Sequence, residues 1–194
     1  MKSKSMRVLL LEPHPDDIAI NMTGYILKHP EHEYKVILFS RITEQVYDEW
    51  ESFIESIGVA GDAVEYERRQ FYDEVDEITD YIYKFKDRFN PDIVFCPSDQ
   101  DIHQDHIVIN KAAITIFGKD TSLIFYGNHN HNLQANYYEV FEQDIMDNKI
   151  EILSKFESQK HRDYFNPEFI LHSHTFNKTG QYAEPYKIYK KVNY

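Results

Sequence analysis

The pattern that most restricts the fold of this chain is a repeated alternation of short apolar runs with amphipathic segments. The apolar runs have the length of buried strands, and the segments between them carry apolar residues at helical spacing. The expected strands are 7–12, 34–40, 63–66, 92–96 and 123–126, and the expected helices are 17–29, 44–57, 71–89 and 104–117. Repeated strand–helix–strand units predict an α/β fold, a Rossmann-like three-layer sandwich whose central sheet is mostly parallel.

Beyond residue 128 the alternation weakens. We expect a strand over 137–141 and a helix over 149–161, and the last thirty residues read as irregular. No internal repeat or low-complexity linker divides the chain. Residues 1–194 are therefore expected to form a single domain.

The overall charge restricts the classes of partner. Asp and Glu outnumber Lys and Arg by 33 to 21, which gives a formal net charge of −12 and argues against nucleic acid or an anionic membrane surface. No apolar run is long enough to span a membrane, and the N-terminal residues do not resemble a secretory leader, so we expect a cytoplasmic protein. Cys96 lies in an apolar run and is interpreted as a buried hydrophobic residue rather than a metal ligand.

Two of the expected strands end in segments that contain His and Asp side chains. Residues 13–17 (PHPDD) follow the first strand, and residues 101–106 (DIHQDH) follow the strand over 92–96. Ligands of α/β proteins bind outside the carboxyl ends of the strands. Because His and Asp are good ligands for zinc and ferrous iron, the two segments together predict one metal site.

The residue types in these segments also fit a division of roles. A catalytic metal site commonly has three protein ligands and an open position, and His14, Asp17 and His106 can supply the three. Asp16 and His103 remain, and they match the base and the acid that chemistry at an activated water requires. Taken singly, a carboxylate before a helix is more often an N-cap and a lone His-x-x-His is more often structural. Their coincidence at two strand ends favours the metal site.

The two segments resemble the metal motifs of the PIG-L/LmbE-type de-N-acetylases, which remove acetyl groups from substrates that contain N-acetylglucosamine. The similarity extends over most of the chain through weaker matches at Gly24, Ile57-Gly58-Val59, Ser158-Gln159 and Tyr182-Ala183-Glu184. One position departs from the family pattern, because Ile18 stands where the family usually has Glu after the two aspartates. This departure could alter the substrate or lower the activity.

The resemblance implies a role for each residue of the two segments. The residues that would bind Zn²⁺ are His14, Asp17 and His106. Asp16 would be the general base, and His103 would be the general acid or the partner of the oxyanion. Asp105 would orient His103 and keep its imidazole charged.

A few residues outside these segments are candidates for substrate contact. Arg41 follows the second strand and could bind a phosphate or carboxylate, although a surface ion pair is equally consistent with its position. His129 follows the strand over 123–126 and lies in either a substrate loop or a polar turn. Glu184 is a candidate through the resemblance alone. His172 and His174 alternate as neighbours in a strand would, and we interpret them as structural or solvated.

The function expected from these features is metal-dependent hydrolysis of the N-acetyl group of an N-acetylated sugar or amino-sugar conjugate. One alternative is a metal amidase that acts on a non-sugar amide. The other is a metal-binding member of the family with lost or altered catalysis. Ile18 in place of the usual Glu suggests this alternative, whereas the retention of Asp16 and His103 argues against it. Zn²⁺ is the expected cofactor, with Fe²⁺ as the alternative. The sequence predicts no oligomeric state.

Overall fold

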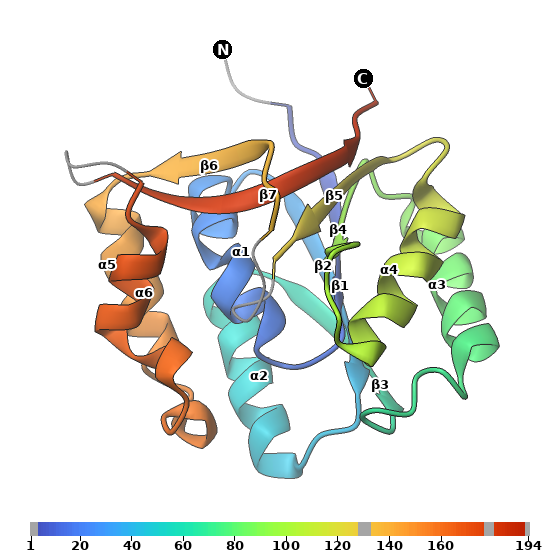
Figure 1. The fold of residues 1–194 in the computed structure, drawn as a ribbon, viewed down its shortest axis with the longest axis horizontal. Helices are drawn as coiled ribbons and strands as arrows, with labels where there is room; N and C mark the ends of the chain where they lie inside the picture. Colours follow the sequence, from blue (N-terminus) through green and yellow to red (C-terminus); the bar gives the residue numbers. More distant parts are fainter. Residues whose placement is uncertain (1–3, 128–132, 177–180, 193–194) are drawn as a thin grey trace.

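A central sheet organises the computed structural model, which describes residues 4–127, 133–176 and 181–192 (Figure 1). Within these ranges the sheet has seven strands in the order β3-β2-β1-β4-β5-β7-β6. The strands are β1 (Arg7–Glu12), β2 (Glu33–Ser40), β3 (Ala60–Tyr66), β4 (Ile93–Pro97), β5 (Ser122–Tyr126), β6 (Tyr137–Phe141) and β7 (Tyr182–Lys190). The first five pair in parallel, whereas β7 is antiparallel to both of its neighbours.

Helices cover both faces of the sheet, as the α/β prediction requires. They are α1 (Asp17–Lys28), α2 (Glu44–Ser56), α3 (Val75–Phe89), α4 (Gln104–Phe117), α5 (Gln143–Leu153) and α6 (Pro167–His174). Helices α3 and α4 lie on one face, and α1, α2, α5 and α6 lie on the other (Figure 1). The predicted three-layer sandwich with a mostly parallel sheet is confirmed. Within the described ranges, no helix is long and apolar enough to cross a membrane.

Strand β1 shows why the parallel strands read as continuous apolar runs. Its side chains alternate between the two faces, so Val8 and Leu10 pack in the core under α1 and α2, while Leu9 and Leu11 pack in the core under α3 and α4. All four side chains are fully buried. Because helices cover both faces of the strand, none of these side chains faces water, and the sequence of the strand is apolar throughout.

The differences from the expected elements lie at the edge of the sheet and in the C-terminal third. Strand β3 begins three residues earlier than expected, because it is an exposed edge strand without an apolar run. Helix α5 spans 143–153 rather than 149–161, and two 3₁₀ turns, Glu157–Gln159 and Asp163–Phe165, follow it.

The segment expected to be irregular contains α6 and β7. The prediction missed β7 because Pro185 interrupts its pattern. Pro185 is tolerated here because the pairing of β7 with β5 covers only Tyr186 to Lys190, so Pro185 pairs with β6 alone. His172 and His174 belong to α6, so the interpretation of these residues as strand neighbours was wrong. His174 is buried and structural.

The pairing of β1 with β4 determines where the site forms. The two strands are adjacent and parallel, with Leu10 opposite Phe95, so the segments that follow them emerge at the same edge of the sheet. Helices α1 and α4 begin at this edge. Their N-terminal ends carry partial positive charge, which favours the carboxylates found there.

The close approach of α1 to β6 generates a prediction about Gly24. A Cβ atom built on Gly24 would lie 2.4 Å from Cε1 of Phe141, so a methyl group cannot be accommodated without displacing the ring. We expect Gly24→Ala to lower the free energy of unfolding by about 1–3 kcal/mol, measured by urea denaturation. Gly127→Ala is the matched control, because its added Cβ would come no closer than 3.5 Å to Leu133. Equal stability of the two variants would contradict this packing.

Candidate metal centre

Three potential ligands converge at the carboxyl edge of β1 and β4. His14 lies in the connection from β1 to α1, Asp17 is the first residue of α1, and His106 lies in the first turn of α4. All three side chains are buried. The backbone N–H of His14 donates to Oδ2 of Asp17 at 2.9 Å, which ties the connection to the helix start.

The ligand atoms of these residues form a small triangle. Nδ1 of His14 lies 3.1 Å from Nε2 of His106, which lies 3.4 Å from Oδ2 of Asp17, and the third side of the triangle is 3.8 Å. A point equidistant from three such atoms lies about 2.0 Å from each, close to the usual zinc–nitrogen and zinc–oxygen distances. The residues therefore fit a divalent transition metal.

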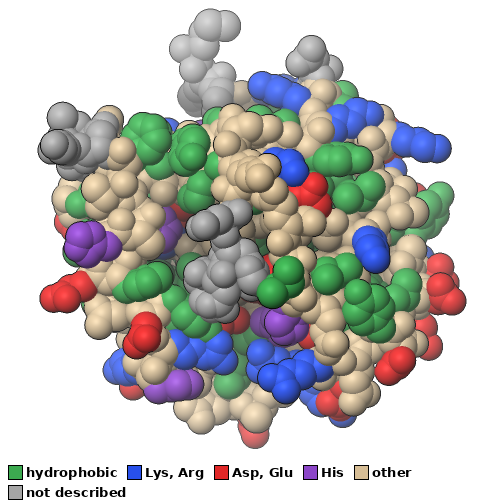
Figure 2. Space-filling model, viewed as in Figure 1, with side chains coloured by type: hydrophobic (Ala, Val, Ile, Leu, Met, Phe, Trp, Pro, Cys, Tyr) green, Lys and Arg blue, Asp and Glu red, His purple; other side chains and the backbone are tan. Residues whose placement is uncertain are grey.

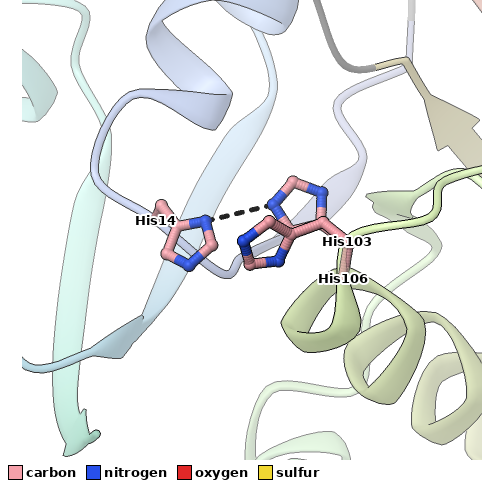
Figure 3. Close-up of side chains that lie close together, drawn as sticks. All are labelled: His14, His103 and His106. Atoms are coloured by element: carbon pink, nitrogen blue, oxygen red, sulfur yellow. Dashed lines mark hydrogen bonds between the residues drawn. The ribbon is translucent and has the colours of Figure 1, made fainter. Parts of the chain in front are cut away.

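A third imidazole, that of His103, lies beside this triangle (Figure 3). His14, His103 and His106 can offer ligand atoms within 4.8 Å of one another, so a three-histidine set is also geometrically possible. We favour the set with Asp17 because its separations are shorter and it adds a negative charge. His103 is also the N-cap of α4, and its Nδ1 accepts the backbone N–H of Asp105 at 3.2 Å.

Two carboxylates contact the ring nitrogens of His106 and His14 that point away from the triangle. Oδ2 of Asp101 lies 2.7 Å from Nδ1 of His106, and Oδ2 of Asp105 lies 3.1 Å from Nε2 of His14. Such contacts fix which ring nitrogen faces the metal. Sequence reasoning gave no role to Asp101, although it belongs to the same segment. Asp105 was expected to orient His103, but it contacts His14 instead, because side chains two positions apart at a helix start point in different directions.

The electrostatics of the triangle are dominated by the pairing of Asp17 with His106. Burial alone would raise the pKa of Asp17, but the imidazoles of His106 and His14 lower it to about 2. Burial alone would lower the pKa of His106, but Asp17 and Asp101 raise it to about 10. The cluster thus attracts positive charge. For His103, burial and the neighbouring imidazoles lower the pKa, whereas Asp105 and Asp101 act to raise it.

Asp16 is held by residues from the C-terminal third. Its Oδ2 accepts a hydrogen bond from the hydroxyl of Tyr164 at 2.9 Å and lies 3.3 Å from Nη1 of Arg162. It stands at the N-cap position of α1, but its side chain makes no capping hydrogen bond. The carboxylate therefore does not have the structural role that its position would suggest. Sequence reasoning missed Arg162 and Tyr164, which lie in and beside a short 3₁₀ turn without any motif.

Asp16 also borders a cavity of about 380 Å³. Its lining comprises Pro15, Asp16, Arg41, Ile42, Thr43, Val46, Glu67, Arg68, Gln159 and Arg162. Arg41 is half-exposed on this wall and forms ion pairs with Glu67 and, at 3.6 Å, with Glu65. Both interpretations of Arg41, as a surface ion pair and as a residue facing a ligand, remain compatible with its position.

The structure contradicts the expected substrate contact of Glu184. Its side chain is fully buried in β7, where its two oxygens accept the backbone N–H groups of Gly24 and Tyr25 and the ammonium of Lys149, each at 2.7 Å. The carboxylate thus reaches the middle of α1, away from any cavity described above. His129, the third predicted contact, lies outside the described residues.

Ile18, the departure from the family pattern, is buried in the hydrophobic core. Its backbone N–H donates to Oε1 of Glu12 at 3.0 Å, and Oε2 of Glu12 accepts the indole N–H of Trp50 at 2.7 Å. Burial raises the pKa of Glu12. A carboxylate therefore lies beside position 18, but it comes from the end of β1.

The chain matches a known family model. The family model PIG-L, described as GlcNAc-PI de-N-acetylase, matches residues 9–117, which include both metal segments. No curated protein sequence matches the chain.

Solved structures extend the likeness to nearly the whole chain. The conserved protein TT1542 from Thermus thermophilus superposes with a TM-score of 0.78 at 18% identity, covering 97% of each chain. N,N′-diacetylchitobiose deacetylase from Pyrococcus horikoshii has a TM-score of 0.75 at 20% identity, covering 95% of this chain and 84% of the other. The 4-carboxy-2-hydroxymuconate hydratase of Pseudomonas putida has a TM-score of 0.69 at 16% identity, covering 97% and 98%. At these identities the likeness establishes the fold, and the hydratase shows that the fold serves more than one reaction.

The buried pair of Glu184 and Lys149 generates a prediction about stability. Glu184→Gln would leave the Lys149 ammonium buried without its counter-charge, beside a His174 whose pKa burial lowers to about 3. We expect the free energy of unfolding to fall by about 3–5 kcal/mol, measured by urea denaturation. The double variant Glu184→Gln/Lys149→Met should recover part of this loss because the stranded charge is gone. Losses that simply add in this double-mutant cycle would contradict a coupled pair.

Proposed function

Because the chain belongs to the PIG-L family of de-N-acetylases, we propose that it removes the N-acetyl group from an N-acetylated sugar or amino-sugar conjugate in a metal-dependent hydrolysis. The observation that most supports this proposal is the triangle of His14, Asp17 and His106, with Asp16 and His103 beside it. Neither Asp16 nor His103 is needed merely to hold an ion. In this proposal residues 1–194 act as one domain.

The three proposed ligands suit Zn²⁺, and Fe²⁺ is the alternative for two imidazoles and one carboxylate. When bound, such a metal supplies Lewis acidity to the acetamide carbonyl and to the attacking water. Asp101 and Asp105 hold the two imidazoles in the orientation that presents Nε2 of His106 and Nδ1 of His14 to the ion. Asp105 is therefore a positioning residue in this proposal.

Asp16 is the proposed base. Water adds to the acetamide carbon while the carboxylate of Asp16 takes its proton, and the C–N bond then breaks to give acetate and an amine. Tyr164 and Arg162 hold the carboxylate of Asp16 in position, since both donate to it.

His103 is the proposed hydrogen-bond donor to the oxyanion. Because Nδ1 accepts a backbone N–H, the neutral ring carries its proton on Nε2, the nitrogen that is left to face a substrate. In this neutral form His103 can donate a hydrogen bond to the developing oxyanion, and the proton that Asp16 takes from the water passes to the leaving amine. This proposal replaces the charged imidazole expected from the sequence.

The role of Asp16 can be separated from metal binding. Asp16→Asn should retain the metal but lower kcat by about 10²–10⁴-fold, because the base is lost. His106→Ala should lose both the metal and the activity, since a ligand is removed. The measurements are acetate release from a panel of N-acetyl sugars, with and without a chelator, and metal content. His161→Ala is the control, because its side chain is exposed and far from these segments in sequence.

The outcomes also distinguish the two alternative functions. Full activity of Asp16→Asn would exclude Asp16 as the base. A wild-type protein that binds metal but releases no acetate from any N-acetyl sugar would favour a member of the family with lost or altered catalysis. Activity on simple amides without a sugar would favour the metal amidase.

The cavity beside Asp16 supports a narrower proposal about the substrate. Three arginines, Arg41, Arg68 and Arg162, contribute to its lining, although the chain as a whole carries a net charge of −12. Figure 2 shows Lys and Arg side chains both in the lower part and at the upper right of the face that it views. Because guanidinium groups bind carboxylates and phosphates, we propose that the substrate carries an acidic group next to its acetylated amine.

This proposal predicts a preference among substrates. N-acetylglucosamine derivatives with a carboxylate or phosphate should have a KM about 10-fold lower than neutral ones, and Arg68→Ala should abolish this difference with little change in kcat for neutral substrates. Steady-state kinetics measures both. Arg88→Ala, at an exposed position of α3, is the matched control. Equal KM values for acidic and neutral substrates would exclude the acidic group while leaving deacetylation intact.

A further inference from the structure

A second group of potential ligands lies at the opposite edge of the sheet. His29, Glu31 and His32, which we call the α1–β2 cluster, occupy the connection between the end of α1 and the start of β2. Each offers a ligand atom within 4.8 Å of the other two. Oε1 of Glu31 lies 3.8 Å from Nδ1 of His29 and 3.9 Å from Nδ1 of His32. The proposed catalysis uses none of these side chains.

The two imidazoles of the cluster are stacked, and among the described residues each has one nitrogen without a hydrogen bond. Their rings are stacked, with centroids 5.5 Å apart and planes inclined by 11°. Within the described part of the chain, the buried atoms Nε2 of His29 and Nδ1 of His32 have no hydrogen-bond partner. Nε2 of His29 lies 3.3 Å from a carboxylate oxygen of Glu139, whereas Nδ1 of the same ring faces Glu31. Buried polar atoms normally find a partner, and a cation can serve as one.

The charges around the cluster favour a bound cation. Burial lowers the pKa of His32, which keeps this ring neutral and its lone pair available. Helix α1 ends at Lys28, and its C-terminal carbonyl groups direct partial negative charge toward the cluster. Glu139 adds a negative charge nearby, although Lys28 neutralises it at 2.6 Å. For that reason Glu139 is not counted as a ligand.

We propose that His29, Glu31 and His32 bind a second divalent transition metal, independent of the one proposed at His14, Asp17 and His106. Two imidazole nitrogens and one carboxylate oxygen select Zn²⁺, Ni²⁺ or Cu²⁺ over Mg²⁺ and Ca²⁺, which prefer oxygen ligands. The two separations to Glu31 exceed the roughly 3.4 Å expected between tetrahedral zinc ligands by about 0.5 Å, and the two histidines, within 4.8 Å of each other, must close by up to about 1.4 Å. The side chains of His29 and Glu31 are 27% and 34% exposed, which leaves them room to rotate.

The stoichiometry of metal binding tests this proposal without reference to activity. Isothermal titration of the chelator-treated protein with Zn²⁺ should give two equivalents for the wild type and one for the double variant His29→Ala/His32→Ala. His106→Ala should also bind one equivalent, and the combination of all three substitutions should bind none. His172→Ala is the control for loss of an exposed histidine and should bind two.

Two further measurements keep the test decisive. Glu31→Gln changes only a partly exposed carboxylate and should weaken the second equivalent by about 10-fold or more, even if the double variant folds poorly. In the His106→Ala background, saturating Zn²⁺ should raise Tm, and this rise should vanish when His29 and His32 are replaced. A single equivalent in the wild type, or two equivalents in a folded double variant, would overturn the proposal. Loss of deacetylation in His106→Ala leaves it unaffected.

Discussion

The parallel pairing of β1 with β4 is the interaction on which the site depends. These strands lie far apart in sequence, and only their adjacency places His14 and Asp17 within ligand distance of His106. The pairing is stabilised by side chains that are buried on both faces, and the first turn of each helix that follows carries one of the candidate ligands, Asp17 in α1 and His106 in α4. The same apolar runs that drive sheet formation therefore also align the ligands. Local motifs could not do this alone.

Helix α1 is held by the opposite end of the chain. Glu184 and Lys149 bind polar backbone groups in the middle of α1, the carboxylate accepting two N–H groups and the ammonium donating to the carbonyl of Ile20. Tyr186 donates to the carbonyl of Asn21 as well. Side chains inserted into a helix in this way restrict its direction. The direction of α1 in turn places Asp17 at the candidate metal centre.

Much of the fold could be predicted because the parallel strands are buried on both faces and the helices between them are amphipathic. The pairing of β1 with β4 and the convergence of His14, Asp17 and His106 followed from strand ends meeting at one edge. The prediction failed where a residue's role is set by distant partners. The carboxylates of Glu184 and Asp105 are of a type found in catalytic sites, but each contacts a residue that is distant in sequence, Gly24 and His14 respectively. Arg162 and Tyr164 reach Asp16 from the far end of the chain, and no local pattern marks them.

The position of β7 has a consequence for the order in which the protein acquires its structure. Glu184 is separated by 160 residues from Gly24, whose N–H it accepts, so α1 leaves the ribosome long before the strand that fastens it. A nascent chain that already carries both histidine segments still lacks this attachment. During that interval α1 lacks the two hydrogen bonds from its backbone to Glu184. This attachment forms only when the antiparallel strand β7 has paired between β5 and β6.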